Sequence, residues 1–326
     1  MKENIREYTL KNEKLTVKFM NYGAYITHVL LENGQNVVMN YADIDSYFDD
    51  KHCLNCFVGP VIGRIANAEF TLEGKEYKLE KNEGEHNLHS GSANLATKFW
   101  DVDVSEEDTC AVLTYQTKDG EGGFPGNVDV SVTYKLEGET LVVKTEAETD
   151  KPTLFAPSLH FHFNLEHFEE GIENHLLKIS SQKFTELTEE VIPTGTLLNV
   201  EDTPFDFRED VKIGSFITKD DPQLNIEGGY DHGFLLQDKE VVLKNKNKTV
   251  ELHATTTEPA VVIYTNNGLT KKEKINKGRD GFKHGAICIE LQKLPDAIHH
   301  ENFPSAVLYP EKPFQEESRY TFRLKQ

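Results

Sequence analysis

The residues best suited to moving protons in this chain are histidines and carboxylates that stand in largely apolar segments. His160 and His162 alternate with phenylalanines in SLHFHFNL, and Glu290 lies in the apolar run AICIELQKLPDA. His89 in HNLHSG and Asp231 in GGYDHGF are further candidates. A buried carboxylate must be paired, hydrogen-bonded or protonated. These groups are therefore either acids and bases or buried structural hydrogen-bonding groups.

Other chemistries lack their usual sequence motifs. The chain has no G-x-S-x-G nucleophile motif, no P-loop or G-x-G-x-x-G after a strand, and no H-E-x-x-H. The two imidazoles of His160 and His162 could bind a metal, but the spacing identifies no third ligand, so we expect neither a metal nor a cofactor. A C-x-x-C pair without a second close pair is a weak zinc signal. We expect buried thiols at all four cysteines: Cys53, Cys56, Cys110 and Cys288.

The elements that must position these residues are predicted to be strands. On a strand, His160 and His162 would share one face while Phe161 and Phe163 take the other. Alternating runs such as KLTVKFMNYG, VDVSVTYKL, TLVVKTEAE, VVLKNKNKTVELHA and YTFRLKQ predict strands with one wet face. Long helical periodicity is absent, and short helices are expected only near 44–48 and 302–304. The sequence predicts an all-β fold, with residues 1–326 in one antiparallel domain of stacked sheets.

Composition narrows the class of partner. The chain has 326 residues, 37% of them hydrophobic, and a formal net charge of −20. This charge argues against nucleic acid and against an anionic membrane surface. No apolar stretch reaches the roughly 18 residues of a membrane span, and MKENIREYTL has no signal-peptide core, so we expect a cytoplasmic protein. The basic segment 270–285 is either a solvated loop or a phosphate contact.

Several short segments then follow one order along the chain. They include GRIAN at Gly63–Asn67, DGEGGFPG at Asp119–Gly126, the run from Thr153 to Leu165, YDHGFLL, IYTNNG and ELQKLPDAIHHENFPS. In that order they resemble the aldose 1-epimerase (galactose mutarotase) family over nearly the whole chain. The resemblance implies a large antiparallel β-supersandwich. It also implies an isomerase that interconverts the α and β anomers of a free monosaccharide such as galactose or glucose, without a cofactor.

The resemblance also implies roles for individual residues. Glu290 would be the general base and His160 the general acid. Five further residues would bind the sugar: His89, Arg64, Asp231, Asn67 and His162.

The sequence departs from the family pattern at several positions. Ala68, Leu159 and Val262 stand where the family has polar or charged residues, and Ser90 replaces a glycine. We expect these departures to change the wall of the pocket that contacts the sugar, so they put the substrate in question more than the reaction. A hexose-6-phosphate 1-epimerase, for which the 270–285 segment would supply the phosphate contact, and a non-catalytic sugar-binding protein are the alternatives.

Overall fold

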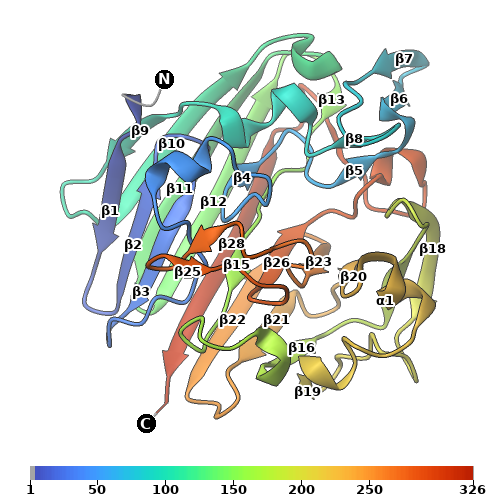
Figure 1. Cartoon of the computed structure of the whole chain (residues 1–326). Helices are drawn as coiled ribbons and strands as arrows, with labels where there is room; N and C mark the ends of the chain where they lie inside the picture. Colours follow the sequence, from blue (N-terminus) through green and yellow to red (C-terminus); the bar gives the residue numbers. More distant parts are fainter. Residues whose placement is uncertain (1–3, 326) are drawn as a thin grey trace.

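The computed structural model describes residues 4–325, and it is built almost entirely from antiparallel strands (Figure 1). The largest sheet has nine strands. In spatial order they are β19 (Val211–Lys212), β16 (Leu176–Ile179), β21 (Glu240–Lys244), β22 (Val250–Thr256), β28 (Phe314–Leu324), β12 (Thr140–Thr149), β11 (Val128–Glu137), β10 (Cys110–Thr117) and β9 (Asp101–Val104). The alternating runs of the sequence are thus strands, and the predicted all-β class is confirmed.

Two smaller sheets lie over the inner face of this nine-stranded sheet. One has six strands, in the order β15 (His162–Phe163), β26 (Ile287–Gln292), β23 (Ala260–Tyr264), β20 (Asp231–Leu235), β17 (Lys183–Leu187) and β18 (Pro193–Asn199). The other has three: β1 (Glu7–Lys11), β2 (Leu15–Met20) and β3 (Ile26–Leu31). Side chains of all three sheets meet in one apolar core.

The remaining strands form short pairs around these sheets. They are β4 (Phe57–Val58) with β14 (Ser158–Leu159), β5 (Arg64–Ile65) with β8 (Asn87–Leu88), β6 (Glu69–Leu72) with β7 (Lys75–Lys78), β13 (Thr153–Leu154) with β27 (Val307–Leu308), and β24 (Lys274–Ile275) with β25 (Arg279–Asp280). Single-domain organisation stays a prediction. It is supported by the core, which includes Leu10 near one end of the chain and Phe322 near the other.

The helices are short, as expected. They are α1 (Pro222–Glu227) and the 3-10 turns η2 (Ile44–Tyr47), η3 (Ala66–Ala68), η4 (Gly91–Ala93), η5 (Leu95–Thr97), η6 (Glu121–Gly123), η7 (Ile172–Asn174), η8 (Ile213–Ser215) and η9 (Ala297–His299). The helix expected near 44–48 is present, but the one expected at 302–304 is wrong: these residues form a turn and an irregular segment. Pro304 disfavours a helical conformation at Phe303. Among residues 4–325, no helix is long and apolar enough to cross a bilayer.

The two faces of SLHFHFNL behave as the alternation predicts. Phe161 and Phe163 are fully buried and pack on Tyr320 of β28, with ring centroids 5.1 and 5.9 Å away. They therefore join the six-stranded sheet to the nine-stranded sheet. His160 and His162, which alternate with them, project to the opposite face, and His160 lines the candidate site there.

A buried carboxyl group also lies on the inner face of β28. Glu316 accepts hydrogen bonds from the hydroxyls of Ser318 and Thr256. Burial raises the pKa of Glu316 from 4.5 to about 8, while those hydrogen bonds act in the opposite direction. The folded protein thus keeps a proton on this side chain over a pH range in which the unfolded chain loses it.

We predict that Glu316→Gln changes the pH dependence of stability. The wild type should lose stability as pH rises from about 5 to about 8, because the folded state must then give up the retained proton. The neutral glutamine has no such cost, so its free energy of unfolding relative to wild type should rise over this range by on the order of 2–4 kcal/mol. Urea unfolding at several pH values measures the difference.

Glu317→Gln, which removes a charge from the solvent side of the same strand, reports the general effect of losing one carboxylate. A constant difference between Glu316→Gln and wild type at all pH values would contradict the prediction.

Candidate active site

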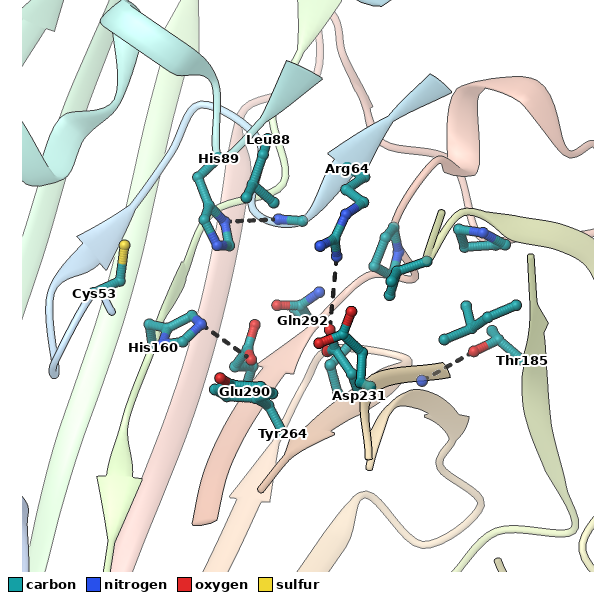
Figure 2. Close-up of a pocket in the computed structure, with 18 of the residues that line it drawn as sticks. Cys53, Arg64, Leu88, His89, His160, Thr185, Asp231, Tyr264, Glu290 and Gln292 are labelled. Carbon is teal, nitrogen blue, oxygen red and sulfur yellow. Dashed lines mark hydrogen bonds and ion pairs between the residues drawn. The ribbon is translucent and has the colours of Figure 1, made fainter. Parts of the chain in front are cut away.

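The floor of the candidate site is one face of the six-stranded sheet. Glu290 and Gln292 project from β26, Val262 and Tyr264 from β23, and Asp231 from β20, all into one cavity of about 170 Å³ (Figure 2). Residues two apart on a strand share a face, and neighbouring strands are in register, so these side chains converge. The side chains on the floor of the site therefore project from strands, which hold them more rigidly than loops would.

The strand register places His160 opposite Glu290. His162 pairs with Cys288 across the antiparallel strands β15 and β26. His160, two residues before His162, therefore lies opposite Glu290, two residues after Cys288. The Nε2 atom of His160 lies 3.5 Å from the Oε1 atom of Glu290, and both side chains are almost completely buried. The pair can thus accept one proton from a molecule in the cavity and give another to it.

Burial controls the protonation of this pair. It raises the pKa of Glu290 well above its ordinary value; the negative charge of Asp231 adds to this, while Cys288 and Arg64 oppose it. Burial lowers the pKa of His160 to about 4, against the raising effect of nearby backbone oxygens. Without a ligand the environment favours a protonated Glu290 beside a neutral His160.

A second histidine is held above the pair by the turn after β8. The backbone N–H of Gly63 donates to Nδ1 of His89 at 3.1 Å, so the proton of the neutral imidazole is on Nε2. The His89 ring stands edge-on to His160, 5.4 Å between centroids, and burial lowers the pKa of His89 well below its ordinary value. Gly63 has a φ of +81°, and a Cβ there would lie 2.9 Å from Pro295, so glycine is required. His89 thus presents a fixed donor.

Arg64 supplies a guanidinium to the cavity, which Lys51 also lines, and carboxylates hold Arg64 on two sides. Its Nε and Nη2 donate to both oxygens of Glu83 at 2.6 and 2.9 Å, and its Nη1 lies 3.6 Å from Asp231. Burial raises the pKa of Asp231 to about 6, although Arg64 opposes this shift. The forked guanidinium fits such two-sided recognition, so the Arg64 charge is largely compensated before any ligand enters.

Two buried or half-buried carboxylates fix the roof of the cavity. Asp50 accepts hydrogen bonds from the hydroxyls of Tyr25 and Tyr41 and from the backbone N–H groups of His52 and Leu54. This holds the loop whose residues Lys51, His52 and Cys53 line the cavity.

Asp296, in the segment after β26, holds the segment from Arg64 to Ala66, of which Arg64 lines the cavity. Its carboxylate accepts from the N–H of Ala66 and contacts His299 at 2.6 Å, and its own N–H donates to the carbonyl of Arg64.

The structure brings together five of the seven residues predicted from the sequence. Glu290, His160, His89, Arg64 and Asp231 all line the cavity. Asn67 and His162 do not.

Asn67 is exposed, with φ of 56°, and its backbone N–H donates to His86. His162 is fully buried behind His160, 4.9 Å between ring centroids. Its Nδ1 lies 3.0 Å from the carbonyl oxygen of His160, which can only accept, so Nδ1 carries the proton.

The departures from the family pattern mostly lie away from the cavity. Ala68 and Leu159 are buried in apolar clusters, and the Ser90 hydroxyl bonds to the backbone of Val61. Only Val262 of the three apolar departures lines the cavity. The expectation that the sugar-contacting wall had changed at all three positions is thus wrong for Ala68 and Leu159.

The basic segment 270–285 contributes no residue to the cavity. It forms the hairpin of β24 and β25, with Lys274 paired to Asp280 and Arg279 paired to Glu169. The solvated-loop interpretation is therefore favoured.

The cysteines are all free thiols, as expected, but their burial is uneven. Cys56 and Cys288 are buried, whereas Cys53 and Cys110 are only partly so.

Two polar residues on the floor of the cavity, Tyr264 and Gln292, are among the lining residues that the sequence analysis did not predict. Tyr264 and Gln292 lie two residues from Val262 and Glu290 respectively, so the same alternation would have placed them on the site face. Gln292 is fully buried, and its side-chain carbonyl oxygen has no hydrogen-bond partner among residues 4–325. It is an acceptor available to a ligand.

Comparison with known proteins identifies the family. The model of the family described as aldose 1-epimerase matches residues 6–321. The chain belongs to the aldose 1-epimerase family. It is 30% identical to a galactose mutarotase of Bos taurus over 98% of this chain and 94% of that protein, and 34% identical to an aldose 1-epimerase of Haemophilus influenzae over 90% and 87%.

Solved structures agree with this membership. A GalM/aldose epimerase homologue from C. elegans superposes with a TM-score of 0.90 at 25% identity, covering 99% of this chain and all of that one. A galactose 1-epimerase from Lactobacillus acidophilus gives a TM-score of 0.88 at 26% identity, covering 99% of both. The supersandwich expected from the resemblance is confirmed.

The hydrogen bonds of His89 and His162 predict opposite tautomers in one protein. His89 should carry its proton on Nε2, because its Nδ1 accepts from Gly63, and His162 on Nδ1, because that atom faces a carbonyl. Long-range ¹H–¹⁵N correlation spectra distinguish the two forms. His89→Gln and His162→Gln variants assign the signals, and a proton on Nδ1 of His89 would contradict the prediction.

Proposed function

We propose that the protein interconverts the α and β anomers of a free hexose of the galactose or glucose type. The observation that carries the proposal is the buried His160–Glu290 pair, 3.5 Å apart on the floor of a cavity that polar side chains surround. Membership of the aldose 1-epimerase family supports the same reaction. The conversion of one anomer into the other requires one proton acceptor and one proton donor close together, as this pair provides.

The proposed reaction is ring opening followed by reclosure. Glu290 takes the proton from the O1 hydroxyl while His160 delivers a proton to the ring oxygen. The bond from C1 to the ring oxygen breaks, and C1 and O1 form an aldehyde. After rotation about C1–C2, the ring oxygen attacks the other face of the carbonyl. The two protons return along the same paths, so the reaction leaves enzyme and sugar balanced.

The electrostatics of the site fit the open-chain stage of this reaction. Ring opening leaves Glu290 protonated and His160 neutral, which is the state that burial favours for both groups. The reactive ion pair is the less favourable state because both side chains are buried. The environment therefore favours the charge state in which the aldehyde exists over the ion pair from which ring opening starts.

The residues around the pair supply hydrogen-bond donors and acceptors that can hold the sugar. His89 presents an Nε2–H donor, Arg64 presents N–H donors, and Asp231 and the Gln292 oxygen present acceptors. Donors and acceptors on several sides of a ring match the alternating hydroxyls of a hexose. Asn67 and His162 are not among the proposed sugar-binding residues, because neither lines the cavity.

A neutral sugar suits this cavity better than a phosphate ester. Glu227, Asp231 and Glu290 line it, and Arg64 is already paired with carboxylates. The basic segment 270–285 lies outside the lining. A phosphate would need an uncompensated cationic clamp, and Lys51 alone is a weak candidate.

No cofactor is needed in the proposed reaction, because the aldehyde forms from the sugar itself. We also propose a cytoplasmic location. The four free thiols support it, since reduced cysteines are usual in that compartment.

The test of the proposal is NMR exchange spectroscopy on the wild-type protein with a panel of aldoses and with glucose 6-phosphate. Accelerated anomer exchange of galactose or glucose supports it. A strong preference for the phosphate ester would select the hexose-6-phosphate 1-epimerase alternative. Saturable binding without faster exchange would select the sugar-binding alternative.

Glu290→Gln should reduce anomer exchange by about 10²–10⁴-fold, because the amide keeps the shape of the carboxylate but cannot accept the proton. His160→Asn should cause a loss of similar size for want of the donor. Polarimetry of freshly dissolved α-galactose measures both rates.

The melting temperature of each variant is the control. A His160→Asn protein that melts early yet keeps its full rate would show that His160 is structural.

Asp231→Asn should raise KM and largely spare kcat. Losing a charged hydrogen-bond partner costs about 1.5–3 kcal/mol of binding, which corresponds to about 10- to 150-fold in KM. Glu227→Gln, which removes the same charge from the same cavity, is the matched control. Unchanged kinetics in Asp231→Asn would exclude Asp231 from sugar binding.

A further inference from the structure

His160 meets two further side chains that can ligate a metal, one imidazole and one thiol. The ligand atoms of His160, His162 and Cys288 all lie within 4.8 Å of one another, and all three residues are buried. The Cys288 sulfur is 3.4 Å from Nδ1 of His160, the ring nitrogen on the other side from Glu290. Neither His162 nor Cys288 lines the cavity, so the cluster adjoins the proton-transfer pair through His160 without opening into the cavity at the other two residues.

His162 has the orientation of a metal-ligating histidine. Its Nδ1–H donates to a backbone carbonyl, the partner that ligating histidines commonly have because it fixes the tautomer and aims the other nitrogen. That other nitrogen, Nε2, is fully buried and has no hydrogen-bond partner among residues 4–325. A buried polar atom without a partner calls for an explanation, and an absent ligand supplies one.

We propose that Nδ1 of His160, Nε2 of His162 and the Cys288 sulfur form a binding site for a divalent ion of the zinc class. Two imidazoles and one thiolate suit such a borderline-soft ion, and three protein ligands leave a fourth position for water. On binding, the Cys288 thiol releases its proton to solvent as the sulfur–metal bond forms, and both imidazoles bind as neutral ligands.

The occupied site switches off the proposed epimerase reaction. With Nδ1 of His160 bonded to the metal, the ring can no longer become an imidazolium that gives a proton to the ring oxygen. The ion is therefore an inhibitor rather than a cofactor. This consequence rests on the proposed function, whereas binding of the ion does not.

Cobalt(II) is the probe, because its visible spectrum reports tetrahedral geometry and its sulfur-to-metal charge-transfer band reports thiolate ligation. Titration of the wild-type protein should give one cobalt per chain with both signals, and zinc should displace it. The absence of a thiolate band in the wild type would overturn the proposal.

Variants test the ligand set. Cys288→Ser should remove the charge-transfer band and weaken zinc binding by more than about tenfold, and His162→Gln should weaken binding comparably. Cys56→Ser is the matched control: it removes another buried thiol, one that belongs to the C-x-x-C pair. If Cys56→Ser abolishes the band and Cys288→Ser leaves it, the metal binds at that pair and the proposal is wrong. Circular dichroism confirms that each variant is folded.

Inhibition of anomer exchange by zinc provides a second, independent test of the site. Zinc should inhibit anomer exchange by the wild type in parallel with occupancy measured by cobalt displacement, and Cys288→Ser should resist inhibition. If the protein showed no epimerase activity, the cobalt spectrum would still test the site. Zinc that binds with the predicted ligands yet leaves exchange unaffected would overturn the inhibitory role.

Discussion

The two-residue alternation of one short strand segment determines where everything else in the site stands. In SLHFHFNL, the phenylalanines enter the core between the six-stranded and nine-stranded sheets, and this packing leaves the histidines no other face. The antiparallel register with β26 then sets His160 across from Glu290. A shift of one residue would exchange the faces and bury the wrong groups. The apolar core thus specifies the position of the chemistry.

The charge pattern of the site follows from that placement. A carboxylate buried on a strand face beneath loops either keeps its proton or is paired with a cation. Glu290 lacks a close cation and is favoured as the neutral acid, while Asp231 and Glu83 share Arg64. The protein carries a net charge of −20, yet its cavity combines a few carboxylates with one largely compensated guanidinium. Such a cavity recognises the hydroxyls of a ligand by the direction of their hydrogen bonds rather than by net charge.

Much of this could be predicted from the sequence, and the failures have physical reasons. Alternation identified the long strands and the two faces of SLHFHFNL, and the order of motifs identified the supersandwich. Periodicity could not show that Glu290 and His160 meet, because their pairing joins segments far apart in the chain. The resemblance suggested that pairing, but it also placed Asn67 and His162 on the sugar, whereas Asn67 is exposed outside the cavity and His162 is buried against His160.

Other features depend on tertiary contacts that no local pattern contains. Cys288 is an isolated cysteine in the sequence, and only the register of β15 with β26 sets it beside two histidines. Glu83 lies in a polar loop without any distinguishing neighbour, yet it holds Arg64 with two hydrogen bonds.

Asp296 has a consequence for the thermodynamics of ligand binding. Because its buried carboxylate and its N–H bond to the segment from Arg64 to Ala66, the roof is fixed to the strand layer before any ligand arrives. A preorganised cavity loses little conformational entropy on association. The enthalpy of sugar binding should then come from the exchange of water for fixed donors and acceptors, and the heat-capacity change should be small, without the large negative value that accompanies the folding of a loop over a ligand.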